Sequence, residues 1–117
     1  MRTTLLLVDD HAGFRARARA LLEAEGFDVV GEATDGRSGV ETAARLHPDV
    51  ALVDIGLPDI DGFTVAGSIL ASHDAGHVVL ISGRAAEDFG DLLARSPADG
   101  FIGKGELTGE RLLALIA

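Results

Sequence analysis

The sequence contains no cysteine, tryptophan or tyrosine, and basic residues are scarce. Without cysteine the chain can form no disulfide scaffold, cysteine nucleophile, thiolate zinc site or cysteine-ligated iron–sulfur cluster. Ten Lys and Arg residues stand against 19 Asp and Glu residues, which gives a formal net charge of −9. Phosphate backbones and anionic lipids repel such a chain, so we expect this segment to bind neither nucleic acid nor membrane directly.

Long hydrophobic runs are also missing. The aliphatic stretches Leu5–Val8 and Val78–Ile81 are far shorter than the roughly 20 residues of a membrane span. Arg2 is followed by too short an apolar run for a secretory signal,. The sequence contains neither of the two glycine-rich loops that commonly bind nucleotide phosphates, G-x-x-x-x-G-K-[ST] and G-x-G-x-x-G after a strand. We therefore do not expect it to bind a nucleotide in the usual way. We expect a soluble, cytoplasmic protein.

Short apolar runs alternate with segments of helical spacing. The chain has 117 residues and is 47% hydrophobic, which suits one compact domain over residues 1–117. The near-continuous apolar runs are typical of strands buried on both faces. They lie at Thr4–Val8, Asp28–Ala33, Val50–Asp54, Val78–Ser82 and Gly100–Ile102.

Five apolar stripes with helical spacing follow these strands. Right-handed crossovers then place helices on both faces of a parallel sheet, so the predicted fold class is α/β, doubly wound. The stripes are Phe14/Ala18/Leu21/Leu22, Val40/Ala43/Ala44, Ala66/Ile69/Leu70, Phe89/Leu92/Leu93 and Leu112/Leu113/Ile116.

Helix ends are marked by capping residues. Ser38 with Glu41 matches a capping box for the second helix, and a start nearer Gly36 is an equal alternative,. Gly26 is suited to end the first helix, and Thr108 to cap the fifth,.

Polar residues stand where the predicted strands end. Asp9 and Asp10 follow the first strand, Asp54 ends the third, Ser82 ends the fourth, and Lys104 comes just after the fifth. Ligands of such sheets bind beyond the carboxyl ends of the strands. Three carboxylates there repel one another, and a hard divalent cation such as Mg²⁺ relieves this. A carboxylate beside such an ion, a lysine and a hydroxyl predict an aspartyl-phosphate site.

Four segments carry a family resemblance that covers essentially the whole chain. Together they resemble the receiver domain of two-component response regulators. The resemblance implies a single flavodoxin-like (βα)5 domain with strand order 2-1-3-4-5. The segments are Val8–Asp10, Val53–Gly62, Ile81–Gly83 and Phe101–Lys104.

The resemblance implies roles for the acidic residues. Asp54 would accept a phosphoryl group from a phosphohistidine of a sensor histidine kinase. Asp10, Asp54 and the backbone carbonyl of Gly56 would bind Mg²⁺, and Asp9 would act through a water on the ion. The protein would then catalyse only its own phosphorylation and dephosphorylation, and so would not be an enzyme for an outside substrate.

The resemblance also implies a switch. Ser82 would move toward the phosphoryl group, Lys104 would pair with Asp54 and then with its phosphoryl group, and Phe101 would turn inward. We expect the fourth helix, fifth strand and fifth helix to form the output face, which is a candidate homodimer contact.

One segment indicates the kind of regulator to which the chain belongs. Lys104–Leu107 resembles the same segment of regulators that carry a C-terminal helix-turn-helix DNA-binding domain. Gly105 departs from the common proline after the lysine. We expect a fragment of a longer transcription regulator. The alternatives are a stand-alone receiver that docks onto partners, and a metal-dependent phosphatase that forms a transient aspartyl phosphate.

Other charged residues receive plainer interpretations. His11 adjoins the acid pair, yet a solvated or packed side chain is favoured over a metal ligand, because the histidines show no ligand spacing,. Arg15, Arg17 and Arg19 alternate along the first helix and are expected to be solvated,.

Overall fold

A computed structural model describes residues 2–117 as a parallel five-stranded sheet in the order β2-β1-β3-β4-β5. This confirms the predicted class and strand order. The strands are β1 Thr4–Val8, β2 Asp28–Ala33, β3 Val50–Asp54, β4 His77–Ser82 and β5 Gly100–Gly103. The helices are α1 Ala12–Ala24, α2 Gly36–Leu46, α3 Gly62–Ala71, α4 Leu92–Arg95 and α5 Gly109–Ile116, with 3-10 turns η1 Ala86–Phe89 and η2 Lys104–Glu106.

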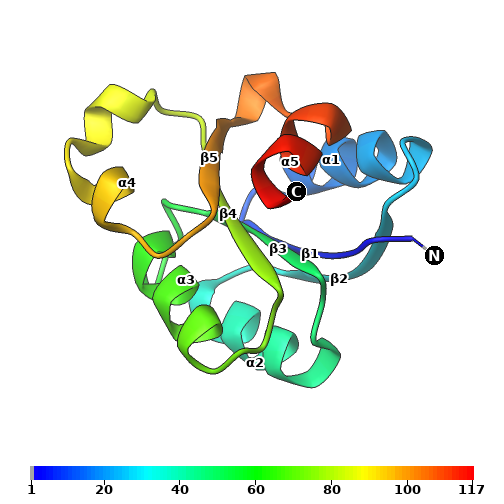
Figure 1. Ribbon diagram of the computed structural model, residues 1–117, viewed down its shortest axis with the longest axis horizontal. Coiled ribbons are helices and arrows are strands. Elements are labelled where there is room, and N and C mark those ends of the chain that lie inside the picture. Colours follow the sequence, from blue (N-terminus) through cyan, green and yellow to red (C-terminus); the bar gives the residue numbers. More distant parts are fainter. Residues whose placement is uncertain (1) are drawn as a thin grey trace.

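Helices cover both faces of the sheet, with α1 and α5 on one side and α2 and α3 on the other (Figure 1). The alternation of side chains along each strand explains the two cores. In β1, Leu5 and Leu7 belong to the core that includes α1 and α5, whereas Leu6 and Val8 belong to the core under α2 and α3. No helix within residues 2–117 is long and apolar enough to span a membrane.

Capping residues set the observed helix boundaries. In α2 the Asp35 carboxylate accepts from the Ser38 backbone N–H at 2.8 Å, and the Ser38 hydroxyl lies 3.4 Å from the Asp35 N–H. The helix therefore starts at Gly36, and the alternative capping box led by Ser38 is wrong. Thr108 caps α5 as predicted, and Gly26 has a positive φ of 99° just after α1.

The predicted fourth helix is interrupted. Gly90 adopts a φ of 55° and separates the turn η1 from the single-turn helix α4. A left-handed glycine ends a helix readily because it carries no Cβ. Of the predicted stripe, Phe89 and Leu93 pack against the α2/α3 core, whereas Leu92 is exposed.

The arginines of α1 differ from the expected solvated surface. Arg15 Nε lies 3.0 Å and Arg19 Nη1 lies 2.7 Å from the Glu32 carboxylate on β2. Hydrogen bonds from Arg19 and then Arg15 lower the pKa of Glu32. Arg15 also donates to the Asp9 backbone carbonyl at 2.6 Å and is only 15% exposed, so it fixes the loop that carries the acid pair. Arg17 is exposed as expected, and the Arg19 side chain is 42% exposed although it pairs with Glu32.

Candidate functional site at the carboxyl edge of the sheet

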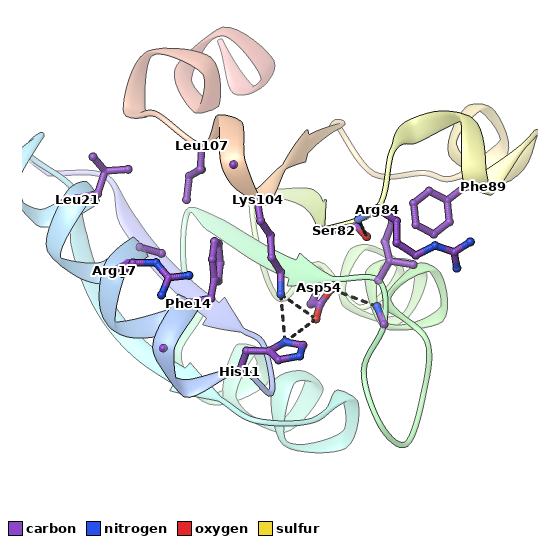
Figure 2. A pocket seen from close by; sticks show the side chains of 16 residues that line it. His11, Phe14, Arg17, Leu21, Asp54, Ser82, Arg84, Phe89, Lys104 and Leu107 are labelled. Atoms are coloured by element: carbon purple, nitrogen blue, oxygen red, sulfur yellow. Dashed lines mark hydrogen bonds and ion pairs between the residues drawn. The ribbon is translucent and has the colours of Figure 1, made fainter.

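The ends of β1, β3 and β5 bring two carboxylates and one ammonium together. Asp9 and Asp54 are 1% and 3% exposed. The Lys104 side chain reaches across from η2, so that its Nζ lies 2.7 Å from Asp9 Oδ2. The same Nζ lies 3.4 Å from Asp54 Oδ2, a contact drawn in Figure 2. The ammonium also sits 4.7 Å from the centre of the Phe14 ring. Residues 95 positions apart in sequence thus form one charge cluster.

His11 belongs to the same cluster, although the sequence favoured a solvated or packed side chain. Its ring is 64% exposed, yet Nδ1 points inward. The Nδ1 atom lies 3.1 Å from Asp9 Oδ1, 3.3 Å from Asp10 Oδ1, 3.8 Å from Asp54 Oδ2 and 3.2 Å from Lys104 Nζ. The His11 backbone N–H donates to Asp9 Oδ1 at 2.7 Å, which anchors this residue at the start of α1.

Burial raises the pKa of the Asp54 carboxyl, and the negative charge of Asp9 raises it further. The Lys104 ammonium and the Gly56 backbone N–H oppose this rise in pKa. Burial and Asp9 thus make the Asp54 carboxylate more basic, while Lys104 and Gly56 favour its ionised form. Such an oxygen is a better nucleophile than an ordinary exposed carboxylate, provided that it is ionised.

The loop after β3 is held at both ends. Its Gly56 N–H donates to Asp54 Oδ1 at 3.2 Å. Further along, the Asp59 carboxylate accepts from the Gly36 and Arg37 N–H groups at 2.7 and 3.0 Å, at the start of α2. The Arg37 N–H, then the Gly36 N–H, lower the pKa of Asp59. The helix N-terminus thereby fixes the loop that carries Gly56.

Ser82 lines the groove beside the cluster, whereas Phe101 on β5 packs against the α2/α3 core. Ser82 is buried, and its hydroxyl accepts from the Arg84 N–H at 3.0 Å. Phe101 is half-buried, and its ring centroid lies 6.1 Å from that of Phe89, which in turn contacts Phe63 edge-on at 5.9 Å. A continuous row of three rings therefore connects β5 to α3 through η1.

The donor atoms fit a divalent cation. One ligand atom from each of Asp9, Asp10, His11 and Asp54 lies within 4.8 Å of the others. Asp9 Oδ2 is buried and receives no well-directed hydrogen bond from the described residues, although the Lys104 ammonium pairs with it. Carboxylate oxygens are the ligands that hard cations prefer, so the cluster can hold such an ion.

A groove of about 1200 Å³ passes over the cluster, with one arm along α1 and the other toward Ser82, Arg84 and Phe89. Figure 2 shows its side chains rising from α1 on one side and from η2 on the other. The wall along α1 is apolar except for one arginine, and the Asp54 carboxylate lies between the two arms of the groove. The residues that define it here are His11, Phe14, Arg17, Leu21, Lys104 and Leu107.

A doubly wound sheet with an acidic cluster and a lysine at its carboxyl edge defines the class of a receiver domain. The family model of the response regulator receiver domain matches residues 5–117. The chain belongs to this family, which confirms the resemblance found in the sequence.

Relatives support the same assignment. BvgA of Bordetella pertussis, named as a transcription regulator of virulence factors, is 33% identical over 106 residues, or 91% of this chain and 51% of BvgA. The DNA-binding transcriptional activator EvgA of Escherichia coli K12 is 28% identical over 86% of this chain and 50% of EvgA. The signal receiver domain of NarL from Mycobacterium tuberculosis superimposes with a TM-score of 0.83 at 31% identity, covering 97% and 96% of the two chains. The chain spans about half the length of the curated relatives that it matches.

Proposed function

We propose that this chain is the phospho-accepting receiver of a two-component system and that Asp54 takes the phosphoryl group from a phosphohistidine of a sensor histidine kinase. The observation that carries the proposal is the position of Asp54, buried between Asp9 and Lys104 at the carboxyl edge of the sheet. This placement leaves a nucleophilic carboxylate next to the positive charge that a phosphoryl oxygen needs.

In the proposed transfer, an Asp54 oxygen attacks phosphorus while the P–N bond of the phosphohistidine breaks and its electron pair returns to the imidazole. Lys104 and the Ser82 hydroxyl would donate to the phosphoryl oxygens. The resulting acyl phosphate would be hydrolysed by water, which returns Asp54 and releases inorganic phosphate. The protein would thus process only its own phosphoryl group.

The cation proposed for this site is Mg²⁺, held by Asp10, Asp54 and the Gly56 carbonyl, with Asp9 acting through water. When bound, the ion would neutralise the phosphoryl oxygens and relieve the repulsion among the carboxylates. Arg15 holds the Asp9 carbonyl, and Asp59 holds the loop of Gly56, so both sides of the metal position are anchored by this chain.

The groove along α1 is the surface on which we place the kinase. A phosphohistidine must reach Asp54, and the groove opens from that residue along Phe14 and Leu21. Its apolar wall and the exposed Arg17 suit a partner helix with an apolar face and an acidic residue,.

Phosphorylation is tested with a small phosphodonor and Mg²⁺, followed by intact-mass measurement. The wild-type chain is expected to gain one phosphate that Asp54→Asn does not gain, because the amide cannot act as the nucleophile. Asp28→Asn, which removes an exposed carboxylate at the start of β2, is the matched control and should gain the phosphate normally. A wild-type chain that gains no phosphate with any donor would refute the proposal.

Two alternatives give different results. A phosphatase would release phosphate from an added ester over many turnovers. A receiver that only docks would show no coupled response to Mg²⁺ and a beryllofluoride mimic. The protein has no tryptophan or tyrosine, so NMR or calorimetry is the suitable readout.

The proposed output is regulation of transcription by a further domain of a longer protein, as the names of the relatives indicate. The signal would pass through Ser82 and Phe101 to α4, β5 and α5, which are also the proposed homodimer contact. We expect beryllofluoride to shift amide resonances across these elements, and also at Phe89 and Phe63, which the ring row links to Phe101. Shifts confined to residues within the loop after Asp54 would contradict this route.

A further inference from the structure

His11 brings a nitrogen atom to a site whose other candidate ligands are oxygens. It lies at the N-cap of α1, where its own N–H is tied to Asp9 Oδ1 at 2.7 Å. The ring Nδ1 is 3.1 Å from Asp9 Oδ1, 3.3 Å from Asp10 Oδ1 and 3.8 Å from Asp54 Oδ2. The Nδ1 atom therefore points into the carboxylate cluster, although the ring as a whole is 64% exposed.

The Nδ1 atom of His11 cannot form favourable hydrogen bonds with all of these neighbours at once. If Nδ1 accepts from the Lys104 ammonium at 3.2 Å, its lone pair also faces the oxygens of Asp9 and Asp10. If Nδ1 carries a proton for those oxygens, it faces the ammonium instead. A divalent cation shared by the nitrogen and the carboxylates would satisfy the acceptor atoms together.

The spacing of the atoms suits such a shared ion. Two ligand atoms at about 2.1 Å from one octahedral ion lie about 3 Å apart when adjacent and about 4.2 Å when opposite. The three distances from His11 Nδ1 to carboxylate oxygens lie between 3.1 and 3.8 Å. Small side-chain shifts would bring Nδ1 and the oxygens of Asp10 and Asp54 to bonding distance of one ion, with Asp9 acting through water as proposed above.

We propose that His11 Nδ1 is a ligand of the metal at this site, which shifts its preference from Mg²⁺ toward divalent ions that accept imidazole nitrogen, such as Mn²⁺ and Ni²⁺. Mg²⁺ gains little from a nitrogen donor, whereas imidazole suits first-row transition metals. This inference rests on the metal centre of the proposed function and adds to it the chemical class of the ion.

Calorimetric titration of the full chain with Mg²⁺, Mn²⁺ and Ni²⁺ tests the preference. His11→Ala is expected to weaken Ni²⁺ binding at least about tenfold and Mn²⁺ binding by a smaller factor, with Mg²⁺ changed by less than about threefold. His73→Asn is the matched control: it removes an exposed imidazole at a φ of 55°, a conformation that asparagine tolerates, and should change none of the three,. Equal losses for all three ions in His11→Ala would overturn the proposal.

A spectroscopic measurement keeps this inference separate from phosphorylation. Electron spin-echo modulation of bound Mn²⁺ should show a ¹⁴N coupling in the wild-type chain and in His73→Asn, and none in His11→Ala. A wild-type spectrum without ¹⁴N coupling would refute ligation by His11. The mass measurement on the wild-type chain tests phosphorylation independently. A phosphate adduct without ¹⁴N coupling would support the receiver function and refute ligation by His11. A ¹⁴N coupling without an adduct would support ligation by His11 and refute phosphorylation.

Discussion

Gly62→Ala is expected to lower the free energy of unfolding by about 2–3 kcal/mol, the upper part of the range for overpacked sites. Gly62 begins α3 directly against the end of β3, and its N–H donates to the Ile55 carbonyl at 2.9 Å. A Cβ at this position would lie 2.6 Å from Ile55 Cα and would also clash with the Asp54 backbone carbonyl. Since both neighbours are backbone atoms, the strand end must move, and the Asp54 carboxylate moves with it.

The same substitution should slow phosphorylation by a small donor about 10–100-fold, because the reacting carboxylate leaves its position between Lys104 and the metal ligands. Urea denaturation and the rate of mass increase measure the two effects. Gly67→Ala is the matched control on the same helix: its Cβ would meet nothing within 4 Å. It should stabilise the fold by about 0.5–1 kcal/mol and leave the rate unchanged. Equal stability for the two variants would show that the close contact at Gly62 is relieved cheaply.

The sheet and the cluster of Asp9, Asp54 and Lys104 could be predicted from sequence for one shared reason. Strands buried on both faces are short, continuous apolar runs, so their ends can be located, and parallel strands bring those ends to one edge. The predicted bounds differ from the observed ones by one residue at His77 and at Gly103. The residues of the site could therefore be found by locating the residue at which each predicted strand ends.

Features that depend on the path of a single side chain could not be predicted. Asp59 reaches the α2 N-terminus 23 residues away, and Arg15 reaches Glu32 on the neighbouring strand. Neither contact has a local pattern, because each depends on tertiary packing. Gly90 is similar, since a glycine inside a helical stripe does not reveal whether its φ is positive,. For His11 a signal did exist in its position next to the acid pair, but spacing rules for metal ligands do not cover adjacent residues.

Lys104→Met is expected to destabilise the fold at pH 7 by about 3 kcal/mol, the cost of removing one partner from a buried ion pair. Methionine keeps the apolar stem beside Phe14 but leaves Asp9 and Asp54 facing each other without the ammonium 2.7 and 3.4 Å away. Phosphorylation should also be strongly slowed, since the ammonium that would donate to the transferred phosphoryl oxygens is gone,. Arg111→Met, which removes an exposed cation on α5, should change stability by less than about 0.5 kcal/mol,.

The dependence on pH identifies the cause of this loss. The pKa of Asp54 is raised in the folded protein by burial and by Asp9, so its charge destabilises the fold at pH above that pKa,. This penalty disappears as the pH falls below the ordinary pKa of the carboxyl. Lys104 opposes the rise, so Lys104→Met should enlarge the penalty, and its destabilisation should shrink between pH 7 and pH 4 in urea titrations. Adding Asp54→Asn should recover part of the stability at pH 7. A loss of equal size at both pH values, unrelieved by Asp54→Asn, would mean that Lys104 acts through its ammonium over the Phe14 ring and not by pairing with the carboxylates.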